Sequence, residues 1–412
     1  MLRLFACGAT PQFHEVLLTT LSGYAGGRSF VVVFSGSDPT RVVREGSRRA
    51  GWALLALSLV GAFGLTALPA PYVISQPGPT YDTLGSVTVD DQEIALIEVK
   101  DQPEYPEFAE IRLTTVTRLG SPDNLPSWLD VISAWLSPQR SVTPVDVAFP
   151  PGVSYEETRE AAAVEMENSQ QEAIAAALGY LDIPYQSYLD VAATLEGGPS
   201  EGVILEGDII LSAAGENIGD VTRLREIIAD NGVQEPLDLV VDRGGVLRDL
   251  QVIPRMSEGP EPFPAIGVLV SGKYEFPIDI SIQLQNVGGP SAGLAFALGV
   301  VERLTEEVVA DSFVIAATGS ITAAGDVGPI GGVAQKAYGA AQSGAEWFLI
   351  PADNCDAVAS TEIRDLTIVP VRTLEDAMSV LESIHLGEEL PSCQNLSALP
   401  SDESQGPTSR GL

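Results

Sequence analysis

Gly288-Gly289-Pro290-Ser291-Ala292-Gly293 places a serine where a β-rich run is expected to turn into a helix. Pro290 suits the first helical position, because proline has no N–H to leave unpaired there. Ser291 then falls in the first turn, where free backbone N–H groups and the positive end of the helix can stabilise an oxyanion. A tight helix start that needs small residues is the structural alternative. A nucleophilic serine in this position also requires a base.

Few residues qualify as that base. The chain holds two histidines and three lysines: His14, His385, Lys100, Lys273 and Lys336. His14 is predicted to lie across a membrane from Ser291, and His385 ends a helix in the polar stretch before the C-terminal tail, so a Ser-His-Asp triad is disfavoured. Lys336 lies on a helix of small residues with no acidic residue between Asp326 and Glu346. Burial there would lower its pKa toward neutrality, as a general base requires. The other two lysines have polar neighbours and are expected at the surface.

The residues around this pair alternate in α/β fashion. We expect helices at 291–304, from the 326–332 turn through 343, and at 374–384, and strands at 312–318, 347–351 and 367–371. Within this frame, residues 286–384 resemble the proteolytic domain of Lon-type serine peptidases, which use a Ser-Lys dyad. The matching stretches are Gly289 to Gly293, Thr318-Gly319-Ser320-Ile321-Thr322, Pro329-Ile330-Gly331-Gly332 through Lys336, and Leu349-Ile350-Pro351.

The resemblance implies a role for each matching residue. Ser291 would be the nucleophile and Lys336 the general base, with Thr318 orienting the lysine. Backbone N–H groups of Ser291 and Ala292 would form the oxyanion hole. The sequence departs from cytosolic Lon proteins, which usually carry acidic residues where Gly288 and Ser320 stand. It is closer to the membrane-anchored PDZ-Lon-like peptidases, whose domain order is similar to almost the whole chain after residue 50.

An uncharged stretch from Ala50 to Tyr81 predicts one transmembrane helix. Arginines precede it and Asp82 is the first charge after it, so the positive-inside rule places residues 1–49 in the cytoplasm and the catalytic part outside. A cleaved signal peptide is the main alternative. Residues 1–50 carry six arginines and three acidic residues, whereas 16 basic and 53 acidic residues follow.

The charge also excludes several classes of function. A net charge of −34 over 412 residues repels nucleic acid. No His/Cys cluster of zinc-ligand spacing and no phosphate-binding loop occurs in the sequence, so we expect neither metal nor cofactor. Cys355 and Cys393 would lie outside the cytoplasm, either as a disulfide or as two buried thiols.

Two further modules are expected between the helix and the catalytic residues. Short β-rich runs before residue 155 predict a small module near the membrane. Gly202 to Gly215 resembles the Leu-x-x-Gly-Asp-x-Ile-Leu segment of PDZ domains, with a carboxylate-binding loop expected before Val191; a structural β-module is the alternative.

The fold class is thus an α/β (α+β) Lon-type proteolytic domain, a β-rich PDZ-like domain, a small β-rich module and one transmembrane helix. The expected boundaries are 1–49 cytoplasmic segment, 50–74 transmembrane helix, 75–155 β-rich module, 156–183 connecting helix, 184–256 PDZ-like domain, 257–388 proteolytic domain and 389–412 flexible tail.

Together these features predict an ATP-independent serine endopeptidase at the cell membrane, single-pass, that cleaves unfolded or flexible polypeptides on the outer side. The resemblance also implies a homo-oligomer, since Lon-like domains often form rings. Two other hypotheses stay open. One is a PDZ adaptor that presents clients to another protease while its own dyad is idle, and the other is a C-terminal-processing protease.

Overall fold

The computed structural model describes residues 45–89, 92–100, 110–149, 155–257, 262–284, 287–305, 313–359, 361 and 363–396. The chain divides into two compact units, residues 1–64 and 65–412. Of the predicted cytoplasmic segment 1–49, residues 1–44 lie outside the described part. The predicted tail 389–412 is described only as far as residue 396.

α1 (Glu45–Ala67) corresponds to the predicted transmembrane helix. Its residues 50–67 are long and apolar enough to cross a bilayer, and none of this stretch is buried. A signal sequence near the N-terminus can also be long and apolar enough to meet these criteria. We therefore call α1 a candidate membrane span. The helix ends earlier than the predicted residue 74, because Pro69 and Pro71 follow it and cannot continue a helix. Val73 and Ile74 are instead buried in the first strand.

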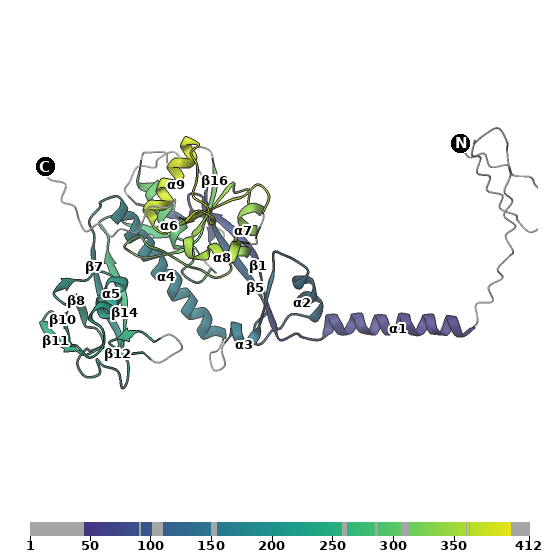
Figure 1. Cartoon of the computed structure of the whole chain (residues 1–412), viewed down its shortest axis with the longest axis horizontal. Coiled ribbons are helices and arrows are strands. Elements are labelled where there is room, and N and C mark those ends of the chain that lie inside the picture. Colours follow the sequence, from purple (N-terminus) through teal and green to yellow (C-terminus); the bar gives the residue numbers. More distant parts are fainter. Residues whose placement is uncertain are drawn as a thin grey trace, which may run out of the picture. The chain divides into compact units, whose positions relative to one another are not determined.

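A six-stranded mixed sheet forms the centre of the domain that contains Ser291 and Lys336 (Figure 1). Its strands, in spatial order, are β20 (Thr367–Val371), β19 (Trp347–Pro351), β16 (Val314–Ala317), β5 (Glu110–Leu119), β1 (Tyr72–Asp82) and β6 (Ser141–Pro144). β20, β19, β16 and β5 run parallel, whereas β1 pairs antiparallel with both β5 and β6.

Helices cover both faces of this sheet. One face packs in a single hydrophobic core against α4 (Tyr155–Tyr180), α6 (Gly293–Leu304) and α9 (Leu374–Leu386). Ala316, Phe348 and Ile350 point to the other face, where they pack with residues of α7 (Val333–Gln342) and with Val358 of α8 (Cys355–Val358). α6 is buried along nearly its whole length because its sequence, GLAFALGVVERL, has no polar side before Glu302.

The sheet contradicts the prediction of a separate module at residues 75–155. β1, β5 and β6 are instead strands of this six-stranded sheet. The predicted connecting helix 156–183 is α4, whose Met166, Ile174 and Leu178 are buried in the same core as α6. Short alternating strands look alike in sequence whether they pair locally or with a strand 200 residues away, because pairing uses backbone groups.

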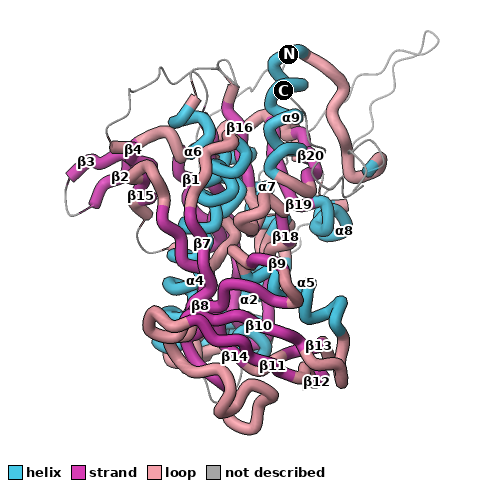
Figure 2. The backbone as a smooth tube through the Cα atoms, turned by 90° about the vertical axis from the view of Figure 1, so that its left-hand side faces the viewer, coloured by secondary structure: helices cyan, strands magenta, loops and turns pink. Residues whose placement is uncertain are grey.

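A second sheet has the order β11-β10-β8-β7-β14, with β9 paired to β8. Figure 2 shows β8, β10, β11 and β14 lying together at the bottom of the view. Its strands are β7 (Gln186–Thr194), β8 (Ile209–Ala213), β9 (Glu216–Asn217), β10 (Leu237–Asp242), β11 (Leu247–Val252) and β14 (Val268–Glu275). α5 (Val221–Asn231) packs its apolar side on this sheet and begins at Asp220, whose side chain accepts from the N–H of Arg223.

β14 corrects the predicted PDZ-like boundary at residue 256, because residues 268–275 complete this sheet by pairing with the whole of β7. The carboxylate-binding loop expected before Val191 is also wrong. Residues 186–189 belong to β7 and pair with β14. The glycine turn that precedes an edge strand lies instead at Gly267, with φ of 73°, directly before β14.

Short elements complete the described fold. They are β2 (Ser86–Val89), β3 (Gln92–Ala95), β4 (Ile97–Val99), α2 (Trp128–Trp135), α3 (Val145–Ala148), β12 (Arg255–Met256), β13 (Pro264–Ala265), β15 (Ile280–Ile282), β17 (Ser320–Ile321), β18 (Val327–Gly328) and the 3-10 turn η1 (Ala352–Asn354). They pair as β2–β3, β4–β15, β12–β13 and β17–β18.

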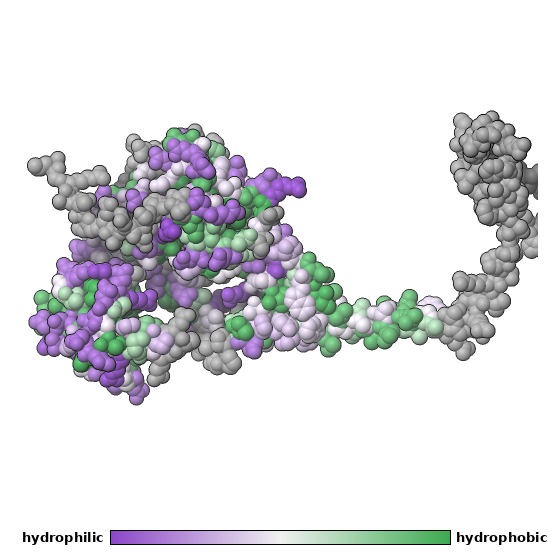
Figure 3. Space-filling view, viewed as in Figure 1, coloured by the Kyte–Doolittle hydropathy of each residue, from purple (hydrophilic) through white to green (hydrophobic). Residues whose placement is uncertain are grey.

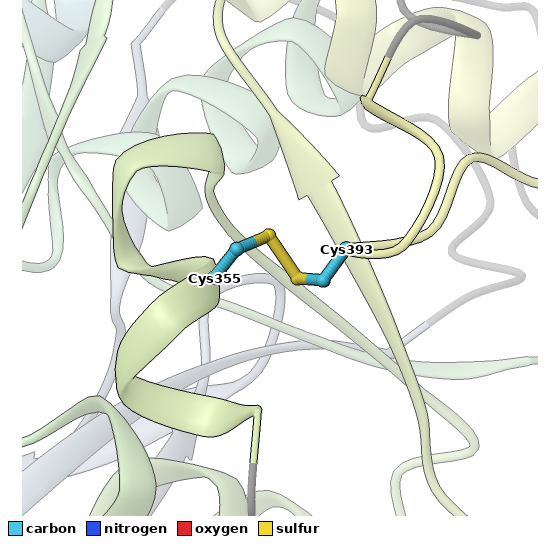
Figure 4. Close-up of a disulfide and its surroundings, with 2 residues drawn as sticks. All are labelled: Cys355 and Cys393. Atoms are coloured by element: carbon cyan, nitrogen blue, oxygen red, sulfur yellow. A yellow bond between two sulfur atoms is a disulfide. The ribbon is translucent and has the colours of Figure 1, made fainter.

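Cys355 and Cys393 form a disulfide (Figure 4), with Cα atoms 5.3 Å apart across a separation of 38 residues. Of the two alternatives that the sequence left open, the structure therefore has the bonded one. Cys393 also packs against the hydrophobic cluster that contains Val333 and Ala337 of α7. The disulfide thus attaches the start of the predicted flexible tail to the domain that contains α7.

We expect Cys393→Ser to lower the free energy of unfolding by about 3–4 kcal/mol, because the disulfide closes a 38-residue loop in the unfolded chain. Urea unfolding of the full chain under oxidising conditions measures this change. Cys7→Ser is the matched control and should leave the midpoint unchanged. If a reductant shifts the parent protein no more than it shifts Cys393→Ser, the disulfide contributes nothing to stability.

Candidate active site

Ser291 lies in the turn between Gly289 and α6, two residues before the helix begins. Gly289 has φ of 87°, a conformation that favours glycine. The helix was expected to include Pro290 and Ser291, but it starts at Gly293, with Ala292 as its N-cap. A side chain at Gly293 would approach within 2.9 Å of Ile321 and Ser169, so only glycine lets the helix start so close to its neighbours.

The end of β16 holds the backbone of Ser291. The carbonyl of Ser291 accepts hydrogen bonds from the N–H of Gly319 at 3.0 Å and from Oγ1 of Thr318 at 2.9 Å. The carbonyl of Gly319 in turn accepts from the N–H of Leu294 at 3.1 Å. The serine is therefore fixed to the sheet on one side and to α6 on the other.

Lys336 approaches Ser291 from α7. Its Nζ lies 2.6 Å from Oγ of Ser291 and 2.9 Å from Oγ1 of Thr318, and its side chain is 3% exposed. Because the Thr318 hydroxyl donates its proton to the Ser291 carbonyl, it can only accept from Lys336. A neutral lysine bound in this way keeps its lone pair for the proton of Ser291.

Burial lowers the pKa of Lys336 from 10.5 to about 7, because the ammonium form loses its hydration. Lys336 forms no ion pair within the part of the chain that the structure describes. The other two lysines are at the surface, as expected: Lys100 pairs with Asp279 and Lys273 with Asp190. His385 is exposed at the end of α9, so the structure does not bring it to Ser291.

The N–H groups predicted to form the oxyanion hole are available. Within the described residues, neither the N–H of Ser291 nor that of Ala292 is bonded to a protein acceptor. Both precede the first turn of α6, whose positive end adds to their attraction for an anion. The geometry thus brings together a serine, a buried amine whose pKa is lowered to about 7 and two N–H donors, which is the set that acyl transfer by a serine nucleophile requires.

Sequence reasoning missed the contribution of α4. Oγ of Ser169 donates to the carbonyl of Pro290 at 2.9 Å, and the N–H of Gly289 donates to the carbonyl of Ala162 at 2.8 Å. A side chain at Gly288 would lie 2.9 Å from Cβ of Ala162. The glycine found where cytosolic Lon proteins usually have an acidic residue is therefore required by the contact with α4.

Asn354 was missed as well. Its Oδ1 accepts from the N–H of Ile330 at 2.9 Å and its Nδ2 donates to the carbonyl of Ile330 at 3.0 Å. Ile330 belongs to the turn that ends at Gly332, whose carbonyl accepts from the N–H of Lys336. Asn354 directly precedes Cys355, so the disulfide lies next to the residue whose side chain holds this turn through two hydrogen bonds. The only signal in the sequence was an amide residue shortly after a buried strand, which is too common to be specific.

Comparison with known proteins identifies the catalytic region. Residues 285–383 match the family model of the Lon protease (S16) C-terminal proteolytic domain. The archaeal Lon protease of Methanothermobacter thermautotrophicus is 39% identical over 117 residues, which is 28% of this chain and 17% of that protein. Lon protease 2 of Bacillus subtilis is 29% identical over 185 residues, 44% of this chain and 30% of that protein. Lon protease of Vibrio parahaemolyticus is 37% identical over 95 residues, 22% of this chain and 12% of that protein.

These matches confirm a serine peptidase domain of Lon type at residues 285–383 and disfavour the C-terminal-processing protease. The matched regions span less than a third of the length of these curated relatives. A PDZ domain of the SdrC-like protein from Listeria innocua aligns with 20% of this chain and 92% of its own length, at 18% identity and a TM-score of 0.19. Because the TM-score is so low, this likeness carries no argument, and the PDZ-like domain stays a prediction from the sequence.

Proposed function

We propose that this protein is a membrane-anchored serine endopeptidase with a Ser291–Lys336 dyad, which cleaves unfolded or flexible polypeptides without ATP on the outer side of the membrane. The 2.6 Å contact between Nζ of Lys336 and Oγ of Ser291 carries the proposal, together with the match to Lon proteolytic domains. Homo-oligomerisation stays a prediction from the resemblance to the Lon family.

In the proposed reaction, neutral Lys336 takes the hydroxyl proton of Ser291 as Oγ attacks the carbonyl carbon of the scissile peptide bond. The N–H groups of Ser291 and Ala292 stabilise the negative oxygen that forms. The C–N bond then breaks and the Lys336 ammonium returns its proton to the leaving amine, which leaves an acyl ester on Ser291. Lys336 next takes a proton from water, whose oxygen attacks the ester carbon. The ester C–O bond then breaks, and the Lys336 ammonium gives its proton to Oγ of Ser291, which releases the acid and restores the neutral amine. Thr318 keeps the amine in place throughout.

Two features support the outer location. Four arginines, at 41, 44, 48 and 49, precede the candidate span, whereas the first charge after it is acidic. The Cys355–Cys393 disulfide suits an oxidising compartment. The proposal of ATP independence comes from the sequence, whose 412 residues contain no phosphate-binding loop.

The test is to incubate the full chain in detergent micelles with casein as an unfolded substrate, without nucleotide. We expect cleavage, and an acyl adduct on the peptide that contains Ser291 when the reaction is quenched with acid and analysed by mass spectrometry. Cleavage that begins only after ATP is added would refute ATP independence. An adduct on a different residue would refute the assignment of the nucleophile.

The pH dependence follows from the lowered pKa of Lys336. The base must be neutral, so kcat/KM should rise with pH, by about tenfold per unit below pH 7, and level off above it. Initial rates between about pH 5 and pH 9 measure this profile. A profile that is flat across this range would contradict the role of Lys336 as the base.

Two control variants make this test specific. Burial and the nearby Asp220 raise the pKa of Glu172 to about 7, so this residue titrates in the same range. Glu172→Gln and His385→Gln should both leave the profile unchanged. A loss of the pH dependence in either variant would assign it to that group.

One observation favours peptide binding by the PDZ-like sheet, as the adaptor hypothesis requires. β14 is the last strand of that sheet, and α5 contacts both β13 and β14. An edge strand beside a helix can accept an added strand from a polypeptide. We propose this edge, rather than residues before Val191, as the PDZ-like binding site. A polypeptide bound at this edge could also be cleaved at Ser291. The adaptor hypothesis therefore differs from the peptidase hypothesis in one respect, namely that the protein itself would not cleave what it binds.

A further inference from the structure

α2 has apolar residues on its outer side as well as its inner side. Val131 and Ala134 are buried against the start of the sheet, whereas Leu129, Trp135 and the C-cap residue Leu136 are 47%, 57% and 83% exposed. Figure 3 shows hydrophobic side chains gathered over α2. In a chain of net charge −34, an exposed face of this composition indicates a contact surface.

Hydrogen bonds hold this helix at the point where the candidate span ends. The N–H of Trp128 donates to the carbonyl of Leu68, and the N–H of Ala70 donates to the carbonyl of Pro126 at 2.8 Å. Pro69 and Ser127 form a β-bridge between them. Because α1 ends at Ala67, the first residue of α2 is bonded to the first residue after the span. If α1 crosses a bilayer, α2 must lie at its surface.

The aromatic residues of this region are those that favour a membrane interface. Tyr72 contacts Trp128 and Trp135 edge-on, with ring centroids 5.9 Å apart in each pair. The chain has four tryptophans, and three of them flank the candidate span: Trp52 at its start, and Trp128 and Trp135 beyond its end. Tryptophan and tyrosine concentrate at the level of the lipid headgroups, because their rings are apolar with one polar edge.

The charges near the exposed face fit the same surface. Both Oδ2 contacts of Asp130 go to Ser127, at 3.0 Å to its N–H and 2.6 Å to its Oγ, so this carboxylate is used within the first turn of α2. Exposed Arg140 lies beside the helix, with Nη1 3.5 Å from Oγ of Ser133. An arginine at the rim of an apolar face suits the phosphates of lipid headgroups.

We propose that Leu129, Trp135 and Leu136 insert into the lipid interface and give the outer part of the protein a second contact with the membrane. This inference rests on the proposed anchoring by α1. α2 connects β5 to β6 and also contacts β1, so the contact would fix that edge of the catalytic sheet. A single helix allows the attached domain to rotate freely, whereas a second insertion restricts that rotation.

The test places an environment-sensitive fluorophore on single cysteines of the full chain, in a Cys7→Ser background, reconstituted in phosphatidylcholine vesicles. Cys355 and Cys393 are bonded to each other and do not react without a reductant. Leu136→Cys reports on α2. The matched control is Leu247→Cys on β11, which is 66% exposed, and Leu59→Cys reports on α1. Leu129→Cys gives a second position on α2 in case one variant folds poorly.

We expect lipids brominated near the carbonyl end of their acyl chains to quench the label at 136 at least about twice as strongly as the label at 247, with a blue-shifted emission at 136. Equal quenching at these two positions, with the label at 59 quenched by deeply brominated lipids, would overturn this inference and leave the anchor intact. A label at 136 that is shielded from water but not quenched would indicate a second copy or a protein partner and overturn it too. Absence of quenching at 59 would overturn the anchor and this inference together, and would leave the proposed chemistry of Ser291 and Lys336 unaffected.

Discussion

Replacing Ser291 with alanine is expected to lower kcat for casein cleavage by a factor on the order of 10⁴ or more. Without Oγ no acyl-enzyme forms, and the attack must come from a water molecule that the site does not position. The N–H groups of Ser291 and Ala292 remain, so a small residual rate above the uncatalysed one should persist. KM should change less than kcat, because Oγ acts in the chemical step.

Initial rates of the full chain, with the acyl adduct followed by mass spectrometry, check this expectation. Ser343→Ala is the matched control. Ser343 directly follows α7, the helix that carries Lys336, and its Oγ donates to the carbonyl of Ala340 in that helix. This variant should cleave at the parent rate. Retention of activity within about twofold by Ser291→Ala would sink the assignment of the nucleophile. Thermal unfolding of Ser291→Ala should stay close to that of the parent, since the backbone contacts of residue 291 remain and Lys336 loses one of its two hydrogen bonds but keeps the one to Thr318.

The pairing of Ser291 with Lys336 could be predicted because each residue is set in a motif with a local physical meaning. The Gly-Pro-Ser-Ala-Gly turn requires small residues for its own backbone, and Lys336 was the one lysine in an apolar setting. The structure places their atoms 2.6 Å apart, and Thr318 on the third motif contacts both residues. Short-range patterns therefore identified the geometry of the candidate site, while its catalytic role stays a proposal.

The frame around the site could not be predicted in the same way. β5 pairs with β16 across about 200 residues of sequence, and β14 is the last strand of a sheet whose first strand begins at residue 186. Backbone hydrogen bonds between strands are the same for every residue except proline, so the side chains of a short β-run do not identify its partner. The partner of each strand is decided by how side chains pack in the folded chain. One such contact is at Gly332, where an added Cβ would lie 2.9 Å from the side chain of Val116 of β5.

The supporting contacts of Ser169 and Asn354 escaped prediction for a related reason. Each uses one small polar side chain to hold a backbone group of a distant turn, Pro290 in one case and Ile330 in the other. Serine and asparagine occur throughout helices and loops, and their partners here are main-chain atoms without a sequence signature. Such contacts become visible only when the two turns are placed in space.

Lys336→Met is expected to lower kcat as far as Ser291→Ala does, because a nucleophile and its base act as one unit and the loss of either stops the same step. Methionine fills most of the volume of the lysine stem but has no group that accepts a proton. The double variant Ser291→Ala, Lys336→Met should therefore be no slower than either single one. A double variant that is slower by the product of the two factors would show that the residues act independently.

Stability distinguishes loss of the base from loss of the fold. The pKa of Lys336 is lowered in the folded state, so between about pH 7 and pH 10 the unfolded chain binds more protons at this residue, and the parent is stabilised as pH rises. Below pH 7 the folded parent carries a buried ammonium, which Lys336→Met removes. Relative to the parent, the variant should thus gain thermal stability at about pH 6 and gain least at about pH 10. An inactive variant that is less stable than the parent at pH 6 would point to a disturbed site instead. If Lys336→Met leaves the cellular phenotype intact, the dyad is idle and the adaptor hypothesis becomes the better account.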